Sequence, residues 1–368
     1  MQNFREEVRA FLDVALTPDL RAAGRATTGF YSDPAAGALW HQRLYDKGWI
    51  AASWPKAWGG TGWSPVERAI FDEECARNDA PILFSTGLRS IGPLIIEMGS
   101  QAQRDAYIER ILRGQDCWCQ GFSEPGAGSD LSGIVASARR DGDTFILNGQ
   151  KIWTTGAHIC NRMFAIFRSD PQSRGNAGMS FFLLDMATPG IRVQPLIDLR
   201  GEHEFNQVFF DDAVIPANCL VGEQDDGWRV ARRLMALARS NNSPSSHTRR
   251  VLNRIRDALP SDAPGEHIAR LAELEVALDA FWAFEQRQLA AASSTGATGS
   301  STLKLLGSEL KQKACELAYD IGAANIDDPE QLTFVTKRYL YSRSASIYSG
   351  TSEVHHNILA RELLKGAV

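Results

Sequence analysis

The chain has 368 residues, of which 44% are hydrophobic and 23% charged, and its net charge is −5. This balance is ordinary for a soluble globular protein of two or three domains, and no apolar run reaches the length of a membrane span. The negative net charge gives no electrostatic reason for binding nucleic acid, and six cysteines are too few for a disulfide scaffold, so we expect reduced thiols and a cytoplasmic protein.

The first expected domain, residues 1–115, is mostly helical. Three segments in it repeat apolar residues at helical spacing, and Asn3 and Ser100 stand where two of these helices would be capped. The apolar stripes are Phe4, Val8, Phe11 and Leu12; Val66, Ile70 and Cys75; and Tyr107, Ile108, Ile111 and Leu112. Residues 52–65, rich in Pro, Gly and Trp, predict an ordered loop.

The second expected domain, residues 116–222, has the two-residue period of strands. Residues 141–157 contain an Asp-Gly and an Asn-Gly turn signal around β-rich runs, which predicts a hairpin. Four further short runs follow, at 161–170, 178–186, 190–197 and 206–216. This spacing indicates a small antiparallel barrel or sandwich.

The third expected domain, residues 223–368, returns to helix. Helices are expected at 227–242, 266–289 and 302–322, with the last two forming an antiparallel bundle. Their stripes are Ile268, Leu271, Leu274, Leu278 and Phe281, and Leu303, Leu306, Leu310, Ala314 and Leu317. The low-complexity stretch 290–302 predicts a flexible turn, and the arginine-rich stretch 249–257 predicts a solvated helix face.

A glycine-rich loop, CQGFSEPGAGSDLSG at 119–133, separates two apolar regions. It is not a Walker loop, because no lysine follows the glycines, and not a dinucleotide fingerprint, because a hairpin follows it. Taken alone, such a loop is more often a surface connection than a binding site.

Three stretches change that balance: GFSEPGAGSD at 121–130, NGQKIWTTGA at 148–157 and IYSGTSEVHHNILARELL at 347–364. Together with residues 54–74 and 205–231, they closely resemble signatures of the acyl-CoA dehydrogenase family, in the same order along the chain. The resemblance implies a mostly α fold with a central β-barrel: an N-terminal helical domain, a middle β domain and a C-terminal four-helix bundle.

The resemblance also implies a cofactor, FAD, held between the middle domain and the bundle. It places Gln120, Phe122 and Ser123 at the isoalloxazine ring, and Ser129 at the pantetheine or pyrophosphate part of an acyl-CoA. Trp153 would pack on the flavin and Thr155 would reach N5, both from one face of a strand, and Thr351 and Glu353 would contact the ribityl and adenosine portions. The alternative roles are core packing for Trp153 and helix capping for Thr351 or Ser352.

The chemistry implied is α,β-dehydrogenation, in which a base removes the α-proton while the β-hydride passes to the flavin. A backbone N–H at Ser349 is expected to bind the thioester oxygen. The family places its glutamate base at one of two positions, and these hold Ser349 and Ala238 here, neither of which accepts a proton. Arg239 binds a substrate carboxylate or carbonyl, or forms a surface salt bridge; the sequence leaves both open.

Four interpretations of the missing base remain open. The glutamate has been replaced by alanine in an active enzyme, the base lies on a partner chain, another carboxylate reaches in, or the flavin site runs a reaction without an α-proton base. Glu124 and Glu353 are not expected to be the base, because the resemblance assigns their motif positions to the loop and the cofactor.

The assembly is equally open from the sequence. The Arg-Gln-x-Phe-Gly and Gln-x-x-Gly-Gly-x-Gly segments that many members direct at a neighbour's FAD are missing from residues 240–252 and 319–331. Short members of this kind resemble subunits of heterotetramers that shorten steroid or other bulky side chains. We therefore expect a homotetramer or a heterotetramer with a related dehydrogenase chain, passing electrons to an electron-transfer flavoprotein. A structural or ligand-binding subunit without chemistry is the competing class, and a flavin-dependent oxygenase a lesser one.

Metal and hydrolase sites have little support. His355 and His356 are adjacent on an expected helix, so their side chains diverge by about 100° and a helix-face role is favoured. Cys117 and Cys119 form only a C-x-C pair, and no G-x-S-x-G occurs. We therefore expect no metal.

Overall fold

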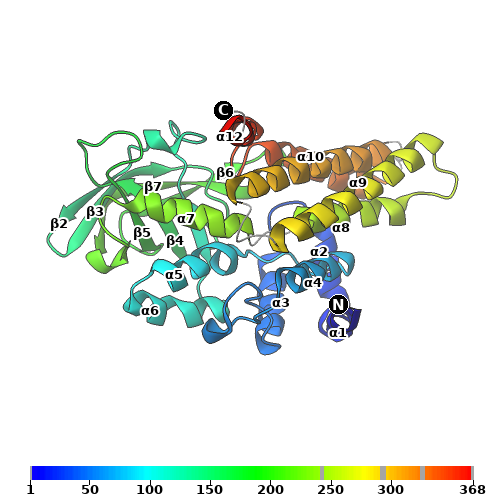
Figure 1. The fold of residues 1–368 in the computed structure, drawn as a ribbon, viewed down its shortest axis with the longest axis horizontal. Helices are drawn as coiled ribbons and strands as arrows, with labels where there is room; N and C mark the ends of the chain where they lie inside the picture. The colour runs from blue at the N-terminus through cyan, green and yellow to red at the C-terminus, as the bar shows by residue number, and fades with distance from the viewer. Residues whose placement is uncertain (1, 241–243, 291–295, 324–327, 366–368) are drawn as a thin grey trace. The chain divides into compact units, whose positions relative to one another are not determined.

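The computed structural model describes residues 2–240, 244–290, 296–323 and 328–365 and divides into two compact units (Figure 1). The first unit comprises Met1–Arg43, Gly62–Leu83 and Asn242–Val368, and the second comprises Leu44–Thr61 and Phe84–Asn241. No helix in the described ranges has the length and apolar character needed to cross a membrane.

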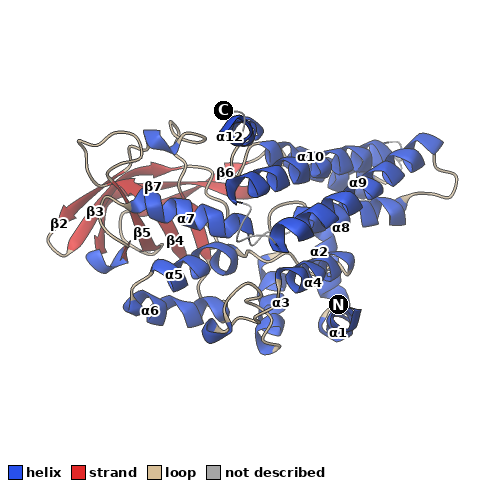
Figure 2. Ribbon diagram, viewed as in Figure 1, coloured by secondary structure: helices blue, strands red, loops and turns tan. Residues whose placement is uncertain are grey.

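The described part of the first unit is helical (Figure 2). Its helices are α1 (Gln2–Ala15), α2 (Pro18–Ala26), most of α3 (Pro34–Asp46), α4 (Pro65–Arg77), α8 (Pro244–Ala258), α9 (Gly265–Ala290), α10 (Gly296–Ala323), α11 (Pro329–Ser342) and α12 (Ser352–Lys365). One core joins α8, α9 and α10 through buried leucines and isoleucines such as Leu252, Leu278 and Leu317. The expected stripes form much of this core, because apolar residues on one helix face leave water together.

Several expectations for these helices are wrong in detail. α1 begins at Gln2, so Asn3 lies inside the helix and does not cap it. Ile268 and Leu306 are 49% and 44% exposed, because each stripe is wider than the strip of helix that the neighbouring helices cover. Residues 296–302 are helical, whereas 291–295 of the expected flexible turn lie outside the described residues.

The arginine-rich stretch 249–257 is also not a solvated face. It lies in α8, where Arg249 and Arg250 are each only 7% exposed because α8 packs against other helices of the unit on more than one side. Arginine stems carry enough apolar surface to be buried in this way.

The second unit combines a mixed β-sheet with three complete α-helices, α5 (Gly92–Met98), α6 (Gln101–Leu112) and α7 (Gly227–Ser240). Its strands are β1 (Trp118–Gly121), β2 (Ser137–Asp141), β3 (Thr144–Lys151), β4 (Arg162–Arg168), β5 (Met179–Asp185), β6 (Ile191–Ile197), β7 (His203–Pro216) and β8 (Leu220–Val221). As expected, Ser100 caps α6, in a capping box with Gln103.

The sheet order is β6-β7-β3-β2-β4-β5-β8, with β1 added beside β4. Within residues 116–222, all of which are described, β6 and β8 end the sheet and do not pair with each other, so the expected closed barrel is not observed. The pairings of β1 and β2 with β4 are parallel, so the sheet is not purely antiparallel.

Of the two turns predicted at 141–157, one is present and the other is a β-bulge. The Asp-Gly signal is a real turn, because β2 and β3 pair antiparallel with Asp141 opposite Thr144. The Asn-Gly signal lies inside β3 and marks a bulge, where the register with β7 shifts between Leu147 and Gly149. Gly149 has φ 121°, a conformation that side chains other than glycine disfavour, which explains its place at the bulge.

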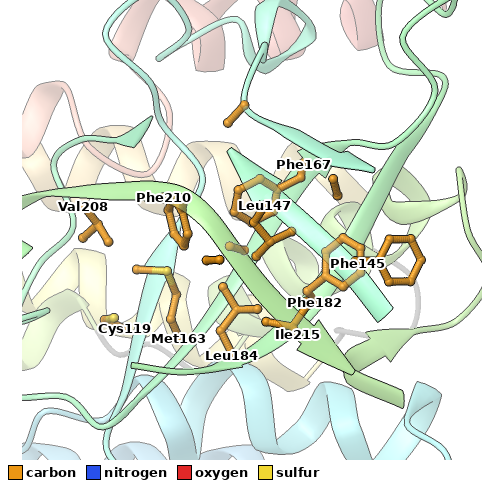
Figure 3. Packing of buried hydrophobic residues seen from close by; sticks show 14 of the residues in the cluster. Cys119, Phe145, Leu147, Met163, Phe167, Phe182, Leu184, Val208, Phe210 and Ile215 are labelled. Carbon is orange, nitrogen blue, oxygen red and sulfur yellow. The ribbon is translucent and has the colours of Figure 1, made fainter. Parts of the chain in front are cut away.

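The core of the second unit lies within this sheet (Figure 3). Phe145, Phe167 and Phe182 interlock edge to face, with ring centroids 4.9–6.1 Å apart. Around them pack aliphatic side chains from β3, β4, β5 and β7, including Leu147, Leu184 and Ile215. The loop at 119–133 and the turn after β3 are attached to the strands that form this core.

Candidate functional site

A buried ion pair anchors the glycine-rich loop. Lys151, the last residue of β3, donates from Nζ to Glu124 Oε1 at 2.7 Å and to the Phe122 carbonyl at 3.4 Å. The Glu124 carboxylate also accepts hydrogen bonds from the backbone N–H groups of Val135 and Ala136. Glu124 therefore ties both ends of the loop to the sheet.

Both charges of this pair are buried, Lys151 completely and Glu124 with 4% exposed. Burial lowers the pKa of Lys151 to about 8, and the Glu124 charge opposes that shift. Such a pair is costly to break, because the remaining charge has no water to replace its partner. Between the anchors, Glu124 and Ala127 exchange backbone hydrogen bonds, which closes a tight turn.

The segment after β3 is a turn and not a strand, which corrects the expected placement of Trp153 and Thr155. The N–H groups of Ile152, Thr154 and Gly156 donate to the carbonyls of Ser123, Asn206 and Glu204, at 2.8, 3.0 and 2.9 Å. These bonds hold alternate residues against the loop and against β7.

Trp153 adopts φ 58° and is 60% exposed. Such a left-handed conformation costs a residue other than glycine roughly 1–2 kcal/mol. The indole meets the edge of Phe205 at 6.1 Å between ring centroids and leaves most of its surface uncovered. Core packing is therefore not the role of Trp153.

Unpaired polar groups occur in this turn and in the loop that is hydrogen-bonded to it. The hydroxyls of Ser123 and Thr155, both half-buried, and the N–H groups of Trp153 and Thr155 form no hydrogen bond with any described residue. Gln120 is exposed and likewise unpaired within the described ranges. An exposed aromatic face beside free donors fits a flat ring with acceptor atoms on its edge, as an isoalloxazine has.

The remaining loop residues behave differently from one another. The Phe122 side chain is buried against Phe164 and Phe181, at 5.9 and 6.0 Å between centroids, which leaves only its backbone for the predicted contact with a ligand. Ser129 is exposed. The glycines beside it, Gly126 and Gly128, have open space where a side chain would be, which allows close approach of a ligand to the backbone.

A second turn, in the first unit, precedes α12. Ser349 and Gly350 have φ 57° and 93°, and the Thr351 hydroxyl accepts a hydrogen bond from the Val354 N–H at 3.3 Å as the cap of α12. Glu353 is exposed, and its pKa is lowered by its own backbone N–H and by the Thr351 hydroxyl. The predicted capping by Thr351 is confirmed.

His355 fixes this turn, a role that the sequence does not reveal. Its ring is 2% exposed, with Nδ1 3.0 Å from Ser301 Oγ and Nε2 3.1 Å from the Ser349 carbonyl. His356 is exposed, as a helix-face residue should be. Within the described ranges, no group of His, Cys, Asp and Glu side chains is arranged to hold a metal ion.

The two expected base positions lie in different units. Ala238 and Arg239 belong to the last turn of α7 in the second unit, and Ser349 belongs to the first. Neither position carries an acid, so the chain offers hydrogen-bond donors and an exposed indole but no proton acceptor at either place.

Comparison with known proteins agrees with this arrangement. Three family models match, described as the N-terminal, middle and C-terminal domains of acyl-CoA dehydrogenase, over residues 1–115, 119–213 and 225–364. The chain is 32% identical to acyl-CoA dehydrogenase IpdE1 of Mycobacterium tuberculosis, covering 99% of this chain and 97% of the relative. It is 27% identical to the human mitochondrial short-chain specific acyl-CoA dehydrogenase, over 86% of this chain and 80% of the relative.

Solved structures show the same fold. The structure described as the Tcur3481-Tcur3483 steroid ACAD has a TM-score of 0.87 at 23% identity and covers 99% of this chain and 97% of the other. A chain from the ChsE4-ChsE5 complex of Mycobacterium tuberculosis has a TM-score of 0.84 at 23% identity, with the same coverage. At this identity these two likenesses establish fold alone.

Proposed function

The chain belongs to the acyl-CoA dehydrogenase family of flavin oxidoreductases, and on this premise we propose that it takes part in the FAD-dependent α,β-dehydrogenation of an acyl-CoA thioester. FAD, when bound, supplies the hydride acceptor. The observation that carries the proposal is Trp153, exposed in a left-handed turn beside the free donors of Ser123 and Thr155.

The residues of this chain have separate roles in the proposal. Trp153 would cover one face of the ring, and Gln120, the Phe122 backbone, Ser123 and Thr155 would hydrogen-bond its edge. The ion pair of Glu124 and Lys151 keeps the loop and the turn in register. Pre-set donors of this kind need no reorganisation when the ligand arrives.

The substrate and the rest of the cofactor would involve other residues. Ser129 and Arg239 would bind the acyl-CoA, and Thr351 and Glu353 the ribityl and adenosine portions of FAD. The Ser349 N–H would donate to the thioester oxygen, with His355 holding the turn through the Ser349 carbonyl. That donor stabilises negative charge on the oxygen as the α-proton leaves.

The α-proton still needs an acceptor, and Ala238 and Ser349 provide none. A specific second candidate follows: the chain is a non-catalytic or FAD-sharing subunit of a heteromeric dehydrogenase whose related partner chain supplies the carboxylate. Two features support this candidate, the absence of an acid at both positions and the paired names of the solved ChsE4-ChsE5 and Tcur3481-Tcur3483 proteins. An electron-transfer flavoprotein would accept the electrons in either case.

The test measures flavin binding and turnover separately. Purified full-length chain is titrated with FAD, and dye reduction is followed after addition of acyl-CoA. We expect flavin binding with little turnover by the chain alone. Turnover appears in Ala238→Glu if the chain is an active enzyme whose base was replaced, or after co-expression with a related dehydrogenase chain if the base lies there.

Ala236→Glu is the matched control, because it adds the same acid to α7 two residues away, about 200° around the helix. A chain that takes up no FAD, alone or with a related partner, contradicts the proposal. Oxygen uptake driven by substrate would instead indicate an oxygenase.

A further inference from the structure

Three arginine side chains of the first unit meet where the described chain offers little negative charge. Arg250 and Arg254 lie one turn apart on α8, and Arg338 lies on α11. Each is within electrostatic reach of at least one of the others. We call these three residues the arginine cluster.

The arginine cluster is buried and poorly hydrogen-bonded. Arg250 is 7% exposed, and the Arg254 side chain is 19% exposed. Arg250 Nη2 reaches only the Cys75 carbonyl, at 3.4 Å, and Arg254 Nη2 the Gly24 carbonyl, at 3.2 Å. Arg250 Nη1 and Arg254 Nε are buried without a hydrogen-bond partner among the described residues.

Negative charge near the arginine cluster comes mainly from Asp79, which acts on all three members. Asp79 already pairs with a fourth arginine, Arg25, at 3.2 Å, whereas its oxygen is 3.9 Å from Arg254. Arg338 forms no hydrogen bond or ion pair with any residue that the structure describes. Asp72 also acts on Arg250, so two carboxylates face four guanidinium groups and positive charge is in excess.

An aromatic ring supports two members of the arginine cluster without neutralising them. The guanidinium carbons of Arg254 and Arg338 lie 4.9 and 5.5 Å from the centroid of the Phe334 ring. Such a ring orients flat guanidinium groups and leaves their N–H edges available.

A buried arginine on α8 can have a carboxylate partner, as the neighbouring Arg249 shows. Arg249 is also 7% exposed, but its Nη2 lies 2.5 Å from Asp279 Oδ1. Burial lowers the pKa of Arg250 to about 10 and of Arg254 to about 9, and both remain charged at neutral pH. A buried charge without a counter-ion is unfavourable, so these positions are suited to a ligand that brings one.

We propose that the arginine cluster binds an oxyanion, a carboxylate or a phosphate group, with Arg25 and Asp79 at its exposed side. The Arg25 and Asp79 side chains are 54% and 23% exposed and mark the side from which a ligand enters. Guanidinium groups donate two parallel hydrogen bonds to a carboxylate or phosphate, which is the pairing that the free N–H groups here allow. The anion is either a free ion or, if the proposed function holds, a carboxylate on the acyl part of the substrate.

The first experiment tests the site itself and needs no activity. The melting temperature of the full-length chain is measured in chloride, inorganic phosphate and glutarate at equal ionic strength. We expect phosphate or glutarate to raise it by roughly 2 °C for each tenfold increase above the dissociation constant. Arg254→Gln and Arg338→Gln should each weaken this response, and the double variant should abolish it.

Arg249→Gln is the matched control, since it removes a buried arginine of the same helix that already has a partner. It should keep the full response to anions. If Arg254→Gln does not fold, Arg338→Gln carries the test alone. An equal response in the double variant, no response in the wild type, or stabilisation only by an added acidic protein would overturn the proposal.

The second experiment identifies the source of the anion by binding of glutaryl-CoA and butyryl-CoA. If the substrate carries the anion, Arg254→Gln weakens glutaryl-CoA binding tenfold or more and leaves butyryl-CoA binding unchanged. If the anion is free, the variant binds both thioesters as the wild type does while its phosphate response is lost. Both readouts are binding measurements, so a chain that oxidises neither thioester still tests the site.

Discussion

Two regions bury charged side chains in opposite ways. In the second unit, Lys151 and Glu124 form a pair in which the carboxylate also receives two backbone N–H groups. In the first unit, Arg250 and Arg254 have mainly carbonyl oxygens and a shared Asp79. In the first region the two charges neutralise each other and the pair holds a loop. In the second region the positive charges lack enough negative charge to balance them. Burial of charge alone therefore does not distinguish a structural site from a binding site. The ion-pair and hydrogen-bond partners of the buried group do.

The largest expected effect comes from breaking the complete pair. Lys151→Met should lower the free energy of unfolding by about 3–5 kcal/mol, because Glu124 is left as a buried charge without its partner. The double variant Glu124→Gln with Lys151→Met should recover part of this loss. Urea unfolding followed by circular dichroism measures both.

A surface pair provides the control for this variant. Arg113→Gln removes a partner of Glu109, with both side chains about half exposed, and should cost only about 0–1 kcal/mol. If Lys151→Met costs no more than Arg113→Gln, the buried pair does not anchor the loop.

The same kind of change in the arginine cluster should have the opposite sign. Without added phosphate or carboxylate, Arg250→Met should raise the free energy of unfolding by about 1–4 kcal/mol, since an apolar side chain replaces a charge that lacks a partner. Arg249→Met should lower the free energy of unfolding by about 0–1 kcal/mol, because it removes an ion pair whose carboxylate, Asp279, is 71% exposed. If both variants lose the same free energy of unfolding, Arg250 is no less well paired than Arg249 and the difference between the two regions does not hold.

A third buried titratable group, the Glu285 carboxyl group, tests the comparison through the pH dependence of stability. Glu285 is fully buried against the Ser245 hydroxyl, and burial raises its pKa to about 7 from 4.5. The folded state therefore holds a proton that the unfolded state releases between pH 4.5 and 7, so this group makes stability fall as pH rises through that range.

Glu285→Gln should remove this dependence and be more stable than the wild type at pH 8 by about 1–3 kcal/mol, with the difference vanishing near pH 4.5. Unfolding midpoints at a series of pH values measure it. Glu275→Gln, which alters a surface pair with Arg256, is the control and should show a much smaller slope. A wild type whose stability rises between pH 5 and 7 relative to Glu285→Gln would show that the sign is wrong.

The smallest expected change in stability is at Trp153. Trp153→Ala should alter the free energy of unfolding by no more than about 0.5 kcal/mol, because the ring is mostly exposed, yet weaken FAD binding tenfold or more. Leu199→Ala, at a side chain that is 79% exposed in the same unit, should change neither quantity. A large loss of stability without a loss of FAD affinity would return Trp153 to a packing role.

Local patterns predicted much of the fold. The stripe of Val8 and Leu12 and the cap at Ser100 are in the structure because they depend on neighbours three or four residues away. The Asn-Gly signal in β3 was misleading for the complementary reason. A glycine with positive φ serves a turn or a bulge equally well, and the pairing with β7 selects the bulge.

For the candidate site, too, some features follow from local sequence and others depend on distant residues. The motifs singled out Ser123, Trp153 and Thr351 as site residues, and these assignments stay predictions. They did not predict the left-handed turn at Trp153, because three backbone bonds to distant segments impose it. His355 could have been suspected only from a partner 54 positions away, Ser301.

The helix–strand–helix order can be read from the amino-acid sequence, because periodicity, capping and turn chemistry act over a few residues. The open sheet, the exposed Trp153 and the burial of Arg250 and Arg254 with too few partners become visible only in the folded chain. Burial and hydrogen-bond satisfaction depend on residues brought together from distant parts of the chain, and no local pattern of amino acids records which segments will meet.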